Sequence, residues 1–398
     1  MGVYDSLGLQ PIINASGGVT RLGGTPMPEP VLEAFHEAAA EWVPLEQLQA
    51  AASKVISQVT GAEAGLVTCG SAAALTLGAA AMMAGYDLGR MEQLPHADGF
   101  PNEFIVPREH RSGYDHAVRA SGARLVEVGF NEVVAGAGVR RAEAWEYEAA
   151  ISERTAGLFY VYGPHSQPPL EDVVAVAKRH KLPVLVDAAG ELPPRANLML
   201  ASITGAHLVA FSGGKALRGP QSTGILCGEA DLIASAALQM LDMDDHWQLW
   251  DPPAKFIDKR KVNGLPRHGI GRALKVSKEE IIALITALAV FMNSDFADLN
   301  AAHREKLEQI AEALDGAVAT CEIIAPDDGE RPPLLEVSVW DSAPSSALEI
   351  CRGLRKGTPP IYVGHGKLSE GKLVINPTCF RPEDAEEIGR RLRRELSR

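Results

Sequence analysis

Cysteine is scarce in this sequence, and its spacing carries no metal signature. Only five cysteines occur among 398 residues, and none of them forms a CxxC pair or a comparable metal-binding spacing. This usage excludes a small disulfide-stapled secreted domain and indicates reduced, mostly buried thiols. We therefore expect a cytoplasmic protein that binds no metal.

Long apolar runs and an excess of positive charge are also missing. The first five residues lack the basic and apolar parts of a signal peptide, and no run is long enough to span a bilayer. Acidic residues outnumber basic ones by 51 to 38, which gives a net charge of −13 and repels polyanions. The sequence therefore predicts neither a membrane nor a nucleic acid as partner.

The remaining composition is that of an ordinary globular protein with more than one core. Hydrophobic residues make up 46% and charged residues 22%, and the length favours two domains. Apolar strands alternate with helical segments up to about residue 280, which indicates a mostly parallel sheet covered on both faces. Beyond that point the periodicity is typical of a small α+β domain. We predict an N-terminal segment (1–45) that joins the small domain, a large α/β domain (46–285) and a C-terminal small domain (286–398).

The expected elements can be placed by residue number. Strands are predicted at 11–14, 64–68, 103–106, 124–128, 156–161, 182–186, 208–211, 223–227, 334–339 and 372–375. Helices are predicted at 72–84, 170–180, 278–292 and 301–313, and two further helices are predicted to begin near residue 28 and at residue 382.

Two strand ends carry the chemistry. The apolar run 208–211 leads into Ser212, two glycines and Lys215, and the run 182–186 ends in Asp187. Their separation of 28 residues (215 − 187) leaves room for one helical crossover, so both side chains would emerge at the carboxyl edge of one sheet. A lysine there can form a Schiff base with pyridoxal 5′-phosphate (PLP), and an aspartate can pair with the pyridine nitrogen. The sequence therefore predicts a PLP site with Lys215 and Asp187 as catalytic residues.

A candidate phosphate cradle lies upstream of both residues. The strand 64–68 runs through Gly70, Ser71 and Ala72 directly into an alanine-rich helix. Small residues let the backbone approach a ligand, and the free amides and dipole of a helix start favour an anion. No P-loop or dinucleotide fingerprint follows a strand here. We predict that these three residues bind the cofactor phosphate, with Ser212 as a second donor.

Several segments resemble a known family. They are INASGGVT at 13–20, TGAEA at 60–64, FSGGKALRGPQ at 211–221 and GRALKVSKE at 271–279. Together they resemble the selenocysteine synthase-like superfamily of PLP enzymes, and most closely its D-glucosaminate-6-phosphate ammonia-lyase branch. The resemblance implies the fold-type-I, aspartate aminotransferase-like architecture and a homodimer or an assembly of dimers. It also implies that Lys215 carries PLP, that Asp187 is the pyridine partner and that His110, within 107–111, stacks on the ring.

Two departures from the transferase pattern bear on the substrate. The INA-type motif comes almost at once, without the tRNA-binding extension that precedes it in the transferase, and VINPT at 374–378 stands where the transferase has an LDLRT-type segment. Both features favour a small amino-acid or amino-sugar-acid substrate over a charged tRNA. Arg218, Arg272 and Lys275 are the basic groups that we expect to bind its anionic groups.

The resemblance implies elimination of ammonia from a 3-hydroxy-2-amino acid. Lys215 would take the Cα proton, the C3 hydroxyl would leave, and hydrolysis would give a 2-keto-3-deoxy acid. The residues alone leave open a racemase, an aldolase or an aminotransferase, because these enzymes use the same groups. A transferase acting on seryl-tRNA and a non-catalytic paralogue stay open as well.

Overall fold

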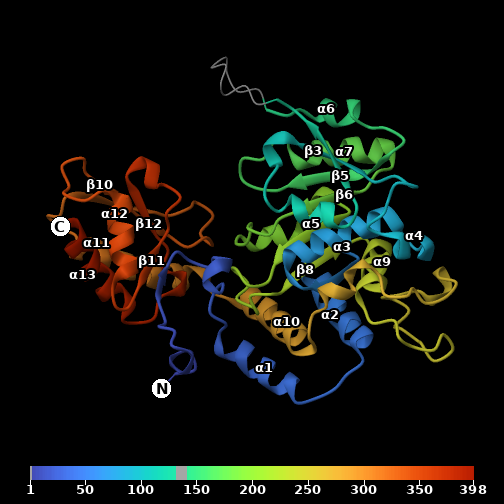
Figure 1. Cartoon of the computed structure of the whole chain (residues 1–398), viewed down its shortest axis with the longest axis horizontal. Helices are drawn as coiled ribbons and strands as arrows, with labels where there is room; N and C mark the ends of the chain where they lie inside the picture. The colour runs from blue at the N-terminus through green and yellow to red at the C-terminus, as the bar shows by residue number, and fades with distance from the viewer. Residues whose placement is uncertain (1, 131–140) are drawn as a thin grey trace. The chain divides into compact units, whose positions relative to one another are not determined.

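The computed structural model describes residues 2–130 and 141–398, and its contacts form two compact units (Figure 1). Unit 1 comprises Met1–Pro26 with Asn293–Arg398, and unit 2 comprises Met27–Met292. The domain boundaries expected from the sequence stay a prediction, because compact units of this kind need not be independent domains.

Unit 2 is built on a seven-stranded sheet with the order β2-β8-β7-β6-β5-β3-β4. The strands are β2 (Ala64–Thr68), β3 (Glu103–Pro107), β4 (Arg124–Val128), β5 (Thr155–Val161), β6 (Val184–Asp187), β7 (Leu208–Ser212) and β8 (Gly224–Gly228). Neighbouring strands from β7 to β4 run parallel, and β8 is antiparallel to both β2 and β7. The mostly parallel α/β sheet predicted from the sequence is therefore confirmed.

The central helix of unit 2 is α3 (Gly70–Ala84), which follows β2 and is apolar on all sides. It packs very close to the sheet, since a Cβ atom on Gly78 would lie 2.9 Å from Leu185 Cδ1. Helix α9 (Ala230–Met240) packs against α3. The other helices of this unit are α1 (Glu29–Ala39), α2 (Leu45–Thr60), α4 (Leu88–Gln93), α5 (Asp115–Ala120), α6 (Ala144–Ala149), α7 (Leu170–His180), α8 (Leu200–Thr204) and α10 (Lys278–Asn293).

Unit 1 has its own core between short strands and three amphipathic helices. An antiparallel sheet has the order β12-β10-β9, and β1 pairs with β11 in parallel. These strands are β1 (Ile13–Ala15), β9 (Ala319–Ile324), β10 (Leu334–Val339), β11 (Ile361–Val363) and β12 (Lys372–Ile375); the helices are α11 (Phe296–Ala313), α12 (Ala347–Lys356) and α13 (Asp384–Leu396). The sequence did not predict β9 or β11.

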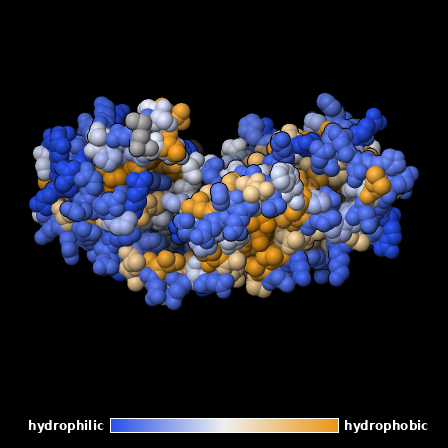
Figure 2. Space-filling view, turned by 90° about the horizontal axis from the view of Figure 1, so that it is seen from below, coloured by the Kyte–Doolittle hydropathy of each residue, from blue (hydrophilic) through white to orange (hydrophobic). Residues whose placement is uncertain are grey.

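Some large apolar side chains are exposed, Trp42 and Leu249 among them. Figure 2 shows apolar patches among hydrophilic areas on one face of the molecule. Within the described ranges no single helix is long and apolar enough to cross a membrane, although α10 and α11 taken together meet the test of length and composition.

Candidate active site

The predicted site residues come from strand ends at one edge of the large sheet. Asp187 ends β6, Ser212 ends β7, and His110 follows β3 after a short 3₁₀ turn. Because β3, β6 and β7 are parallel members of the same sheet, these ends share its carboxyl edge. Helix α3 begins at the same edge, since β8 lies antiparallel between β2 and β7.

Lys215 lies in a tightly folded segment, residues 213–224, which we call the lysine loop. The Gly213 N–H donates to the Thr223 carbonyl (2.8 Å), and the Gly219 N–H donates to the Gly213 carbonyl (2.9 Å). A Cβ atom on Gly214 would lie 2.4 Å from Gln221 Cα, so the chain folds back closely just before the lysine. The two glycines of the SGGK motif are therefore required by close packing of the loop against itself.

Asp187 and Lys215 lie within electrostatic reach of each other. The Asp187 Oδ1 atom accepts a hydrogen bond from the Ala189 N–H (3.0 Å). Burial raises the pKa of Asp187, while the Ala189 N–H and the positive charge of Lys215 act to lower it. The Lys215 Nζ atom lies 3.9 Å from the position of a Cβ on Gly190, so the amine faces the turn that follows Asp187. A half-buried carboxyl with a raised pKa is a group that a cationic ring nitrogen would stabilise as the carboxylate.

The start of α3 has the properties of an anion site. Gly70 adopts a positive φ of 81°, and no side chain caps the helix, whose first amides belong to Gly70, Ser71 and Ala72. The backbone of β8 approaches closely, because a Cβ on Gly224 would lie 2.5 Å from the Ser71 nitrogen. Ser212 pairs with Gly224 across the β7–β8 ladder, which places it beside this helix start.

His110 is a buried and neutral side chain at the same edge. It is 6% exposed, and its ring meets Tyr160 edge-on at 4.7 Å. The Val161 N–H donates to Nδ1 (3.2 Å), whereas the buried Nε2 makes no hydrogen bond of normal geometry with the described residues. Burial lowers the pKa of His110 to about 4, which outweighs the opposing effect of Glu109. A backbone hydrogen bond with Gln167 acts to raise the pKa of His110, so the imidazole already has a partner within the protein.

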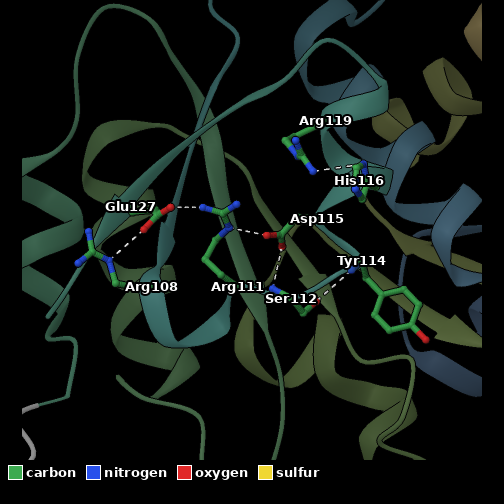
Figure 3. Close-up of polar contacts among 8 residues, drawn as sticks. All are labelled: Arg108, Arg111, Ser112, Tyr114, Asp115, His116, Arg119 and Glu127. Carbon is green, nitrogen blue, oxygen red and sulfur yellow. Dashed lines mark hydrogen bonds and ion pairs between the residues drawn. The ribbon is translucent and has the colours of Figure 1, made fainter. Parts of the chain in front are cut away.

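An ion-pair network fixes the chain directly after His110 (Figure 3). The Arg111 guanidinium donates to Glu127 on β4 and to Asp115 in the first turn of α5. Arg108 donates to the other oxygen of Glu127 (2.9 Å), and Asp115 is 3% exposed. Sequence reasoning missed Glu127 and Asp115, because only their positions in space connect them to the site.

The predicted substrate cations differ in their surroundings. Arg218 belongs to the lysine loop and adopts a positive φ of 59°. Arg272 donates to Asp242 Oδ2 from Nη2 (2.6 Å) and Nε (3.1 Å). The pKa of Asp242 is held below its usual value mainly by the hydrogen bond from the Asp244 N–H and, to a smaller extent, by Arg272. Lys275 is exposed.

Comparison with known proteins identifies the family. A family model, SelA: L-seryl-tRNA selenium transferase, matches residues 114–243. A 5′-C-glycyluridine monooxygenase-decarboxylase of Streptomyces sp is 30% identical over 401 residues, which covers 98% of this chain and 90% of the relative. The chain belongs to the selenocysteine synthase-like family of PLP enzymes. This family membership, the fold-type-I architecture and the PLP cofactor were all predicted from the sequence and are confirmed.

Other members of the selenocysteine synthase-like family match over the whole chain. The D-glucosaminate-6-phosphate ammonia lyase of Salmonella typhimurium is 29% identical over 402 residues, which covers 98% of this chain and 97% of the relative. A solved structure of D-glucosaminate-6-phosphate ammonia-lyase superposes with a TM-score of 0.81 at 27% identity, covering 100% of this chain and 98% of that one.

The site of this selenocysteine synthase-like chain fits PLP. The uncapped start of α3 offers backbone donors to a phosphate, and the buried ring of His110 lies at the same edge of the sheet. The half-buried Asp187 and the lysine amine near it match the two charged positions that the cofactor requires.

Proposed function

We propose that this chain is a PLP-dependent ammonia-lyase. Its substrate would be a 3-hydroxy-2-amino acid similar to D-glucosaminate 6-phosphate, converted to a 2-keto-3-deoxy acid and ammonia. The observation that carries the chemistry is the placement of Lys215 and Asp187 after adjacent parallel strands, within reach of each other's charge. The full-length similarity to the Salmonella lyase and to the solved lyase structure supports this reaction. We also propose that the enzyme is cytoplasmic and forms a homodimer or an assembly of dimers.

Each residue of the proposed PLP site would have a separate role in the reaction. Bound PLP supplies an electron sink for the bonds at the substrate Cα. Lys215 would hold the cofactor, and its Nζ atom would then accept the Cα proton. Asp187, held by the Ala189 N–H, would keep its carboxylate on the pyridine nitrogen. The α3 amides would hold the phosphate, and the His110 ring would lie on the cofactor face.

The substrate anions would be bound by Arg218, Arg272 and Lys275. Two separated anionic groups, a carboxylate and a distal phosphate, need more than one cation, and arginine is suited to bidentate contact. Arg272 is already held by Asp242, so a substrate anion would share or replace that carboxylate.

The first test is chemical mapping of the cofactor. Borohydride reduction of the purified protein, followed by peptide mapping, should place the pyridoxyl group on Lys215. A label on another lysine, or none after incubation with PLP, would refute this assignment. Release of ammonia and keto acid from D-glucosaminate 6-phosphate should then be measured, because inversion at Cα without ammonia would identify a racemase instead.

A second candidate function is oxidative decarboxylation. It is favoured by the 30% identity with the Streptomyces monooxygenase-decarboxylase over 98% of this chain. The two reactions leave different products, since the oxygenase consumes O2 and releases CO2. Oxygen uptake and CO2 release in the same substrate screen therefore separate it from the lyase.

A further inference from the structure

A carboxylate with no role in the reaction above lies beside the candidate phosphate cradle. Glu280 is in the first turn of α10, where its Oε2 accepts from the Ser277 N–H (3.1 Å) and its own N–H donates to Ser277 Oγ (3.3 Å). These reciprocal bonds resemble a capping box. Its other oxygen, Oε1, accepts a hydrogen bond from the hydroxyl of Ser222. One side chain thus joins the start of α10 to the lysine loop.

Ser222 in turn lies against the start of α3. Its carbonyl oxygen is 3.6 Å from the position of a Cβ on Gly70. Two residues later, Gly224 touches the backbone of Gly70 and Ser71, with 2.4 Å between its Cβ position and the Gly70 carbonyl carbon. A displacement of Ser222 would therefore move the chain that packs on the cradle.

The other end of the lysine loop also rests on α10. Leu284 Cδ1 lies 2.6 Å from the Cβ position of Gly213 and 2.9 Å from that of Gly219. The loop is consequently held between α10 and the start of α3, with Glu280 as the polar link.

The charge of Glu280 reaches the cradle as well. Cys69 is the exposed residue before the first turn of α3, and its thiol pKa is raised by partial desolvation and, second, by the negative charge of Glu280. A phosphate dianion bound at the same helix start would experience repulsion from that charge.

We propose that Glu280 is a positioning residue for the cofactor phosphate, with two opposing effects. Its bond to Ser222 holds the lysine loop against the start of α3 and favours phosphate binding. Its negative charge repels the bound dianion and weakens binding, which leaves the cofactor exchangeable. This inference rests on the proposed PLP site at Lys215.

The test compares the dissociation constants of PLP and of pyridoxal, which lacks the phosphate, for the apoprotein and its variants. Ser222→Ala removes the link and keeps the charge, so PLP binding should weaken by roughly 10-fold, the scale of one hydrogen bond to a charged group, while pyridoxal binding changes less than about 2-fold. Glu280→Gln removes the charge and keeps one acceptor oxygen for the Ser222 hydroxyl, while its NH2 group cannot accept from the Ser277 N–H. It should bind PLP about 3-fold or more tightly than the parent at low salt, and the gain should shrink at high salt.

The matched control is Glu279→Gln, which removes the same charge from the neighbouring residue. Glu279 pairs with Lys278 at 3.3 Å, so PLP affinity should stay within about 2-fold of the parent. Circular dichroism and melting curves establish that each variant is folded, and inorganic phosphate as a competitor of PLP gives a second readout with the same expected order.

Three results would overturn the inference. They are equal weakening of PLP and pyridoxal by Ser222→Ala, a loss of PLP affinity in Glu280→Gln that does not depend on salt, and an equal gain in Glu279→Gln. If borohydride mapping instead shows no cofactor on Lys215 of the parent protein, the proposed function fails together with this inference. If the cofactor maps to Lys215 but the variants bind PLP as tightly as the parent, only the proposed role of Glu280 fails.

Discussion

Replacing Gly214 by alanine should misplace Lys215, the proposed catalytic residue. The added methyl carbon would lie 2.4 Å from Gln221 Cα and 2.8 Å from the Gln221 carbonyl oxygen. Both are backbone atoms, so no side chain can rotate away to relieve the clash. Ordinary contact begins at 3.4 Å, and the loop would therefore have to open by about 1 Å next to Lys215.

The expected loss can be estimated in two parts. Overpacking of this kind costs about 1–3 kcal/mol of folding free energy. A reacting group that is misplaced by about 1 Å loses on the order of 100-fold in rate. We therefore expect a moderate loss of stability and a much larger loss of kcat.

Urea unfolding of the apoprotein and steady-state kinetics with saturating PLP measure the two parts separately. Gly264→Ala is the matched control, because its Cβ would meet only Leu88 Cδ1 at 3.9 Å, and it should change both quantities little. If Gly214→Ala keeps both parental stability and parental kcat, the close approach between Gly214 and Gln221 does not exist in the protein.

Three further predictions concern charge. Because burial raises the pKa of Asp187, its charged form destabilises the apoprotein at neutral pH. The variant Asp187→Asn should therefore unfold at a higher urea concentration at pH 7, and this gain in stability should disappear as the pH falls through the folded-state pKa of Asp187. With PLP bound, the same variant should lose most of its kcat. The pKa of His110 is lowered from 6.5 to about 4, so the folding stability that it contributes above pH 6.5 is lost as the pH falls toward 4. The variant His110→Gln should remove up to about 3 kcal/mol of this pH-dependent change in stability, which urea titrations at several pH values would measure. Arg272→Met should reduce kcat/KM by a factor that corresponds to a loss of about 1.5–3 kcal/mol of transition-state stabilisation. Asp242→Asn should lower KM, because it removes the carboxylate that competes with the substrate for Arg272. An unchanged KM in Arg272→Met would contradict the proposed role of Arg272.

The sequence predicted the large sheet well because most of its strands are buried on both faces, β4 at the edge being the exception. The runs that become β6 and β7 are almost purely apolar, so their ends at Asp187 and Ser212 could be located without a structure. The antiparallel direction of β8 could not be predicted, since hydrophobic periodicity carries no direction.

Two strands of unit 1 and two charged residues of the candidate site could not be predicted from the sequence. β9 alternates half-buried and exposed positions with polar residues among them, and β11 has only three residues, so neither gives a strong pattern. The candidate site was located through its backbone motifs, whereas the partners that fix it, Glu127 and Glu280, lie on other elements. Ordinary charged residues at such positions acquire their role only through folding.

The pairing of β1 with β11 has a consequence for the order in which the chain can fold. Ile13 pairs with Ile361, and both are buried, although unit 2 lies between them in the sequence. During synthesis unit 2 is therefore complete before the first strand has a partner. Until the ribosome has released residues 361–363, Ile13 and Ala15 cannot enter their native core, and the nascent chain exposes them to chaperones and proteases.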